Sequence, residues 1–212
     1  IPHDEASIID INDLYLEIPA GAFYQDTKLR YQRAIDAGSE IYSAVHHIHD
    51  PLTPIQKALR LRLTPNRLIP DSLWFNLVVA RCPAEPDSRP VSYGSALKEN
   101  GDPAFVEIMD FGDYCLLTDT VPPTITPKEI SGSLHRRRRI SFVVKDNFAT
   151  SGAARGLRYR ATLNGEWLLM EYDLKKDLLF HVFEKPLPPG KHILELRVMD
   201  DRGNETVYVK EG

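Results

Sequence analysis

The stretch GDYCLLTDTVPPTI (residues 112–125) decides how the chain is divided. An apolar, strand-like run from Tyr114 to Leu117 leads directly into Asp-Thr-Val-Pro-Pro. Two consecutive prolines cannot both donate to a sheet ladder, and each favours an extended conformation in the residue before it. We therefore expect the chain to leave one β-sheet here and to enter another. This predicts an N-terminal domain over residues 1–119 and a C-terminal domain over residues 120–212.

The composition is typical of a folded protein with many turns. The 212 residues are 42% hydrophobic and 26% charged, which suits one large or two ordinary domains. Sixteen prolines favour short strands over long helices. No run approaches the roughly 18 apolar residues that a membrane-spanning helix needs, so we expect no membrane span.

Apolar residues alternate with polar ones on both sides of the proline pair. Leu59, Leu61 and Leu63 alternate with two arginines, and this period of two indicates a half-buried strand. Leu14, Leu16 and Ile18 repeat the pattern. In the second half the same pattern predicts strands over residues 140–144, 157–163, 166–172, 178–183, 192–198 and 205–209.

Two Asn-Gly pairs predict tight hairpins, one at Asn100-Gly101 and one at Asn164-Gly165. We find no helical pattern of about ten residues, and a parallel sheet usually needs helical crossovers. The predicted class is therefore all-β, with two consecutive antiparallel β-sandwich domains, the second immunoglobulin-like.

The two cysteines, Cys82 and Cys115, lie on strand-like segments before the proline pair. We expect a pair of small buried hydrophobic side chains, with a disulfide between neighbouring strands as the alternative.

The sequence His46-His47-Ile48-His49 is a candidate zinc site. On a strand, residues 47 and 49 share a face, so both imidazoles could reach one ion, and Asp50 could complete the site. The interpretation we favour is a strand end with partly exposed histidines, without metal.

Acidic and amide side chains near the expected loop ends form a candidate calcium site, because calcium requires six or more oxygen ligands. We favour the alternative, in which such residues satisfy local backbone groups in turns. The candidates are Asp119, Asp146, Asp200 and Asn204.

A basic run and an aromatic residue of the second half form a candidate binding surface. The run lacks interleaved aromatics, which argues against nucleic acid and leaves a solvated strand entrance or a surface for an anionic envelope polymer. Trp167 lies on an expected strand, as a core or interface residue or as a platform for a sugar. The residues of the run are Arg136, Arg137, Arg138 and Arg139.

The chain shows no arrangement expected of a catalytic centre. Its serines lack the Gly-x-Ser-x-Gly elbow, no glycine-rich phosphate loop follows a strand, and the carboxylates show no acid/base spacing. We expect no catalytic residue and no bound cofactor in this sequence.

Several segments, in their order, resemble the C-terminal region of secreted lysostaphin-type (LytM-like) zinc metallopeptidases of Bacteroidetes. In that family a peptidase domain precedes β-sandwich modules and cleaves peptidoglycan cross-links. The resemblance implies that this chain is the non-catalytic tail, because the family's His-x-x-x-Asp and His-x-His zinc motifs are not both present. The segments are LYLEIPAGAF (14–23), FGDYCLLTDTVPPTI (111–125), FVVKDN (142–147), LNGEWLLMEYD (163–173) and GKHILELRVMDDRGN (190–204).

The resemblance also sets the expected function. We expect accessory modules of an exported protein, in the periplasm or associated with the outer envelope, that position a peptidase domain or bind a wall component. The partners would be that peptidase domain and peptidoglycan or another envelope polymer, and zinc would belong to the peptidase domain alone. The alternative is a stand-alone adhesion or glycan-binding module.

Overall fold

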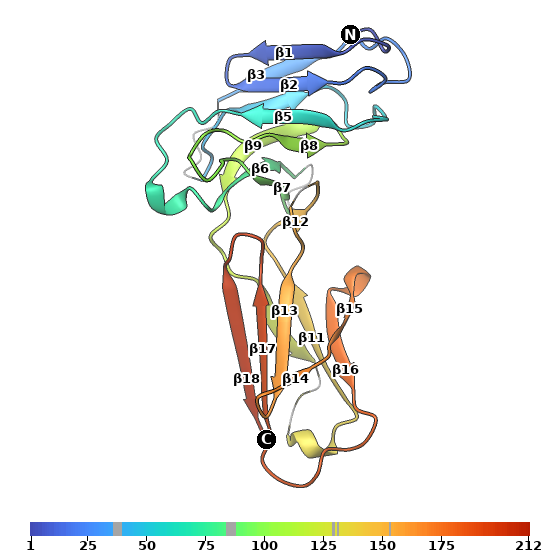
Figure 1. The fold of residues 1–212 in the computed structure, drawn as a ribbon, viewed down its shortest axis with the longest axis vertical. Helices are drawn as coiled ribbons and strands as arrows, with labels where there is room; N and C mark the ends of the chain where they lie inside the picture. The colour runs from blue at the N-terminus through green and yellow to red at the C-terminus, as the bar shows by residue number, and fades with distance from the viewer. Residues whose placement is uncertain (36–39, 84–87, 129, 131, 153) are drawn as a thin grey trace. The chain divides into compact units, whose positions relative to one another are not determined.

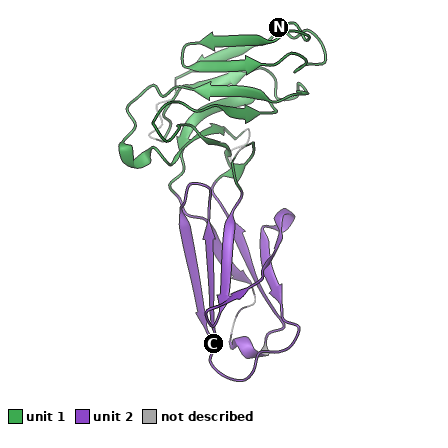
Figure 2. Cartoon of the chain, viewed as in Figure 1, with its two compact units in different colours: residues 1–120, 148–155 green, residues 121–147, 156–212 purple. Residues whose placement is uncertain are grey.

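The computed structural model describes residues 1–35, 40–83, 88–128, 130, 132–152 and 154–212. They form two compact units: unit 1 contains residues 1–120 and 148–155, and unit 2 contains residues 121–147 and 156–212 (Figure 2). The described helical segments are short 3-10 turns, Asp71–Leu73, Leu134–Arg136 and Leu174–Lys176. The predicted all-β class is confirmed. No helix in the described part of the chain is long and apolar enough to cross a membrane.

Unit 1 is built from two sheets (Figure 1). The first is antiparallel and has the order β1 (Ser7–Ile11), β2 (Leu14–Ile18), β5 (Leu59–Leu63) and β8 (Val106–Ile108). The second has the order β12 (Ala149–Thr150), β7 (Val91–Ser95), β6 (Leu77–Arg81), β9 (Gly112–Thr118), β4 (Val45–Ile48) and β3 (Tyr31–Ala34). Its pairs are antiparallel except for β12 with β7, which is parallel.

The core of unit 1 lies between these sheets. Leu59, Leu61 and Leu63 are all fully buried, whereas Arg60 and Arg62 point outward, as the alternation predicts. The second sheet contributes residues such as Tyr114 and Leu116 to the same core cluster. Burial of alternate apolar residues from two sheets is the main stabilising term in a β-sandwich.

A segment from beyond the proline pair belongs to unit 1. The backbone N–H of Ala149 donates to Pro90 O at 2.9 Å, and that of Ser151 donates to Ser92 O at 2.8 Å. Phe148 packs on Val78 and Ala80, which lie on the face of β6 that is turned away from the first sheet. The sequence does not predict this return, because no local pattern marks a two-residue strand that pairs with a distant one.

Unit 2 is also a two-sheet antiparallel sandwich. One sheet has the order β10 (Thr124–Lys128), β11 (Arg139–Lys145), β16 (Leu178–Val182) and β15 (Glu171–Asp173). The other has the order β14 (Glu166–Leu168), β13 (Arg158–Leu163), β17 (Ile193–Met199) and β18 (Glu205–Glu211). Its core cluster includes Phe142 from the first of these sheets and Leu196 from the second, both fully buried.

Both Asn-Gly pairs form tight turns, but only one of them joins two named strands of the same sheet. Asn164 and Gly165 have positive φ values of 55° and 85° and join the paired strands β13 and β14, so the predicted hairpin is confirmed. Gly101 also has a positive φ, of 84°, but it lies between β7 and β8, which belong to different sheets. The predicted tight reversal is present there, because the backbone N–H of Lys98 donates to Asp102 O at 2.8 Å and Leu97 pairs with Pro103 in an antiparallel bridge. The longer strands on either side do not pair with each other, because β7 and β8 join different sheets.

Strand β10 was missed because it contains Pro127, which normally argues against a strand. The strand lies at the edge of its sheet and pairs only with β11, where Pro127 faces Phe142. An edge position tolerates proline, because the missing N–H would point away from the sheet.

Replacing Leu61 by alanine should destabilise unit 1 by about 2–5 kcal/mol, because the change leaves a cavity between the two sheets. Leu68→Ala is the matched control, since this leucine is 96% exposed and its truncation should change the free energy of unfolding by less than about 0.5 kcal/mol. Equilibrium urea denaturation of both variants measures the difference. Equal stability of the two variants would contradict the assignment of Leu61 to the core.

Candidate functional site

The outward face of the first sheet in unit 1 carries an ordered group of aromatic and charged side chains. Tyr15 on β2 is the cross-strand partner of Arg62 on β5, and the guanidinium of Arg62 stacks on the Tyr15 ring at 4.6 Å. The same guanidinium lies 5.1 Å from the ring centre of Phe105, and the rings of Tyr15 and Phe105 meet edge to face at 5.6 Å. Stacked guanidinium and aromatic groups are held in fixed positions, because each contact limits the rotamers of the next.

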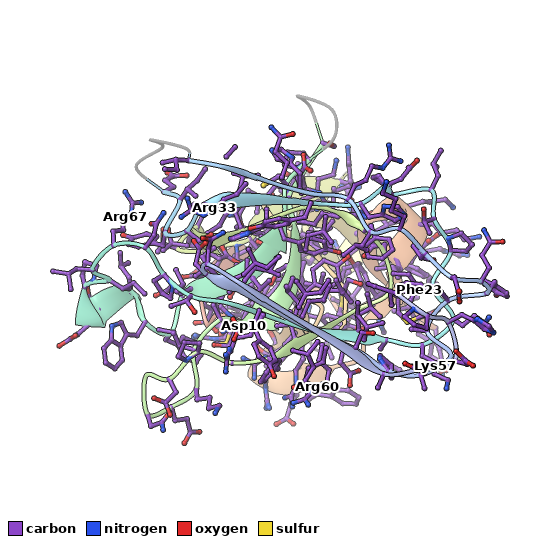
Figure 3. The ribbon with its side chains drawn as sticks, turned by 90° about the horizontal axis from the view of Figure 1, so that it is seen from above. Asp10, Phe23, Arg33, Lys57, Arg60 and Arg67 are labelled. Carbon is purple, nitrogen blue, oxygen red and sulfur yellow. The ribbon has the colours of Figure 1, made fainter. Side chains whose placement is uncertain are left out.

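A second pair of charged residues, Glu17 and Arg60, lies on the same two strands. Arg60 stacks on Phe105 at 4.4 Å, and its Nη1 donates to Glu17 Oε2 at 2.6 Å. Arg60 and Glu17 also border a hollow of about 260 Å³, in which Ile8 is 64% exposed. In Figure 3, Arg60 is labelled on the side of unit 1 opposite to Arg33. We call Tyr15, Glu17, Arg60, Arg62 and Phe105 the outer-face group.

A polar cluster lies at the other side of unit 1, around His46. The ring of His46 is fully buried, with Nδ1 3.0 Å from the Tyr31 hydroxyl and Nε2 3.7 Å from Asp13 Oδ2. Asp13 accepts from Nε of Arg33 at 2.8 Å. Asp13 belongs to the turn between β1 and β2, whereas Arg33 and His46 are paired on β3 and β4, so the cluster ties the two sheets together.

Burial controls the protonation of this cluster. It lowers the pKa of His46 to about 4, and the nearby Asp13 carboxylate offsets only part of that effect. Burial alone would raise the pKa of Asp13, but the hydrogen bond from Arg33 holds it below its ordinary value. His46 is therefore neutral and Asp13 ionised near neutral pH. The cluster has a buried histidine that solvent and ligands do not reach, which suits a structural role.

The family model of the Zu5-like domain matches residues 1–119, which make up most of unit 1. The chain belongs to the Zu5-like domain family. No curated protein matches the chain. The Zu5-like domain therefore contains the outer-face group, the His46 cluster and both cysteines, and it ends at Asp119.

The structure separates the three histidines of the candidate zinc site within the Zu5-like domain. His46 is buried, whereas His47 lies on the opposite face of β4, with Nδ1 2.6 Å from Asp113 Oδ1. His49 has a positive φ of 51°, which turns it out of the strand, and its ring packs edge-on against Phe111. Among the described residues, no group of three metal-ligating side chains contains a histidine.

The candidate calcium ligands divide between the Zu5-like domain and unit 2. Asp119 is buried, and its backbone carbonyl accepts from Asn76 Nδ2 at 2.8 Å. In unit 2, carboxylate oxygens of Asp146 and Asp200 lie within 4.8 Å of each other. Asp200 accepts from the backbone N–H groups of Arg202 and Asn204 and from Asn204 Nδ2, at 2.8–2.9 Å. These contacts are the local turn bonds that the alternative interpretation expects, and calcium binding stays a prediction.

Only the last residue of the basic run lies on a strand of unit 2, and that strand is in a different sheet from Trp167. Arg136 ends the 3-10 turn Leu134–Arg136, and Arg139 begins β11 and stacks on Phe180 at 4.3 Å. Arg137 and Arg138 lie between them, and Arg138 O accepts from the backbone of Phe183. Trp167 is on β14 of the other sheet and is 63% exposed, so it is not a core residue.

The outer-face group of the Zu5-like domain was not identified from the sequence. Its arginines were predicted to point outward, but their aromatic neighbours come from β2 and from the residue before β8. Only the strand register brings these side chains together, and the sequence does not specify which strands are neighbours. A half-buried tyrosine opposite an arginine on adjacent strands is the signal that a known register would have provided.

The His46 cluster predicts a specific dependence of stability on pH. The pKa of His46 is lower in the folded state, near 4, than its ordinary value of 6.5, so protons bind the unfolded state preferentially. The free energy of unfolding should therefore fall as the pH drops from 6.5 to 4, by up to about 3 kcal/mol from this residue. Urea denaturation at several pH values measures the slope.

The variant His46→Gln should remove most of that slope, whatever its stability at neutral pH. His49→Gln is the matched control, because burial and the neighbouring Arg30 also lower the pKa of His49, but this ring is only partly buried. The control should keep most of the wild-type slope. A slope that is unchanged in His46→Gln would contradict the account of the cluster.

Proposed function

We propose that the chain is a non-catalytic accessory module of an exported cell-envelope protein, and that the outer-face group binds a wall polymer. The parent protein would be a peptidoglycan-cleaving zinc metallopeptidase, with zinc held by its peptidase domain. The module would be periplasmic or associated with the outer envelope and would keep the enzyme on its substrate. We further propose that unit 2 is immunoglobulin-like.

The outer-face group is the observation that carries the polymer-binding proposal. It lies on the outward face of a sheet, combines two aromatic rings with two guanidinium groups and a carboxylate, and borders a hollow. Sugar rings have apolar C–H faces and a rim of hydroxyls. Aromatic rings can stack on the apolar faces, and charged groups can form hydrogen bonds with the hydroxyls.

The stacked arrangement favours binding over a purely structural role. Arg60 and Arg62 keep hydrogen-bond donors at the surface while their stems cover Phe105 and Tyr15. Since the guanidinium groups are held by ring contacts, less conformational entropy is lost when they meet a ligand.

The alternative is a stand-alone adhesion or glycan-binding module that acts through unit 2. Its supporting observation is Trp167, which is 63% exposed on the hairpin formed by β13 and β14. An exposed tryptophan on a strand gives a sugar a wide stacking surface. In this case the basic run would contribute charge from the other sheet.

Co-sedimentation of the purified chain with insoluble peptidoglycan tests the proposal. Wild type should bind, and Arg62→Ala and Tyr15→Ala should each weaken binding by at least about fivefold, which corresponds to the loss of about 1 kcal/mol. Arg139→Ala is the matched control, because it removes an arginine stacked on an aromatic ring at 4.3 Å in unit 2. This control should bind like wild type.

Trp167→Ala distinguishes the two surfaces. Binding that is lost in this variant and kept in Arg62→Ala would support the alternative and overturn the assignment to the outer-face group. No binding by wild type would contradict the polymer-binding proposal altogether. Circular dichroism confirms that each variant is folded before its affinity is compared.

A further inference from the structure

The two cysteines of the chain meet on the second sheet of unit 1. Their sulfur atoms lie 3.0 Å apart, although the residues are 33 positions apart in the sequence. Cys115 is on β9 and pairs with Ala80 on β6, and the backbone N–H of Cys82 donates to Asp113 O at 2.7 Å. Cys115 on β9 and Cys82, one residue beyond the end of β6, are therefore diagonal neighbours across this antiparallel strand pair.

The strand pairing explains why the sulfurs approach each other. Tyr114 and Leu116 face the core between the sheets, so Cys115 between them points to the opposite face. Ala80 opposite Cys115 has a short side chain, which leaves room for the sulfur of Cys82 to reach across from just beyond the end of β6. A distance of 3.0 Å is shorter than an ordinary sulfur–sulfur contact, so the pair needs little movement to form a bond of about 2.05 Å.

The two thiols differ in their access to solvent. Cys115 is fully buried, whereas Cys82 is partly exposed and lines a hollow of about 360 Å³ together with Arg81, Arg89 and Asp113. A small disulfide reagent therefore reaches Cys82 first, and Cys115 is positioned to attack the product. This division of accessible and buried thiol is the arrangement that thiol–disulfide exchange requires.

We propose that Cys82 and Cys115 are a dithiol–disulfide pair that cross-links β6 to β9. The Cys82 thiolate attacks one sulfur of an oxidant disulfide such as oxidised glutathione, which forms a mixed disulfide and releases one glutathione thiolate. The Cys115 thiolate then attacks the Cys82 sulfur and releases the second glutathione. The two cysteine thiols are oxidised, the glutathione disulfide is reduced to two thiols, and the two cysteine protons pass to them.

The cross-link joins two strands in the middle of the six-stranded sheet. The cross-link limits the conformational entropy of the unfolded chain between the two cysteines, so it should stabilise unit 1. The inference rests on the position of the sulfurs alone and does not depend on the proposed function.

Incubation of the purified full chain with oxidised glutathione tests the proposal. We expect no thiol that reacts with Ellman's reagent after denaturation, a mass lower by two hydrogen atoms, and one peptide pair joined through Cys82 and Cys115. Calorimetry should show the melting temperature of unit 1 about 10 °C higher in the oxidised than in the reduced chain.

Two variants identify the order of the steps. Cys115→Ala should retain glutathione on Cys82, because the resolving thiol is gone, and Cys82→Ala should acquire no glutathione while it is folded. Neither variant should show a melting temperature that depends on oxidant. Two free thiols in the oxidised wild type, a stable glutathione adduct on it, or cross-linked dimers in place of the internal bond would overturn the proposal.

Discussion

The burial of strand β6 on both faces is the constraint on which unit 1 depends. Leu77 and Val79 face the first sheet, and Val78 and Ala80 face the other way, yet all four are fully buried. A strand that is apolar on both faces needs a cover on each side. The first sheet covers one face, and Phe148 packs on the other, beside Leu117 of the neighbouring strand β9. The return of residues 148–155 to unit 1 thus follows from the composition of β6.

The close fit of that segment supports this view. Gly152 has a positive φ of 58°, and a Cβ atom there would lie 2.7 Å from the backbone oxygen of Glu107. Such an approach is open only to glycine, because both the conformation and the space exclude a side chain. The segment is therefore packed against unit 1 through its backbone as well as through Phe148.

The parts of the fold that follow from local pattern were predictable from the sequence. Burial of Leu59, Leu61 and Leu63 needs only a period of two, and the turn at Asn164-Gly165 needs only residues that tolerate positive φ. The outer-face group and the pairing of β12 with β7 were not predictable, because they depend on which distant strands become neighbours. At Asn100-Gly101 the local sequence predicts the turn, but it does not predict which sheet the next strand joins.

The candidate sites also differ in whether the sequence alone shows them. The outer-face group, the His46 cluster and the cysteine pair each join residues from different strands, so none is a sequence motif. The histidine run is a sequence motif, but alternation and the positive φ of His49 send its rings to three separate environments. In this protein the strand register determines which polar, aromatic and sulfur-containing side chains meet, whereas residues adjacent in the sequence point to different faces.

Amide hydrogen exchange of the full chain tests most directly the claim that residues 148–155 complete unit 1. The amides of Ala149 and Ser151 donate to Pro90 and Ser92, so we predict that they exchange at least about 100-fold more slowly than in an unstructured peptide. Phe148→Ala should remove this protection and also speed exchange at β6. Exchange of Ala149 and Ser151 at the rate of an unstructured peptide in the wild-type chain would contradict the account.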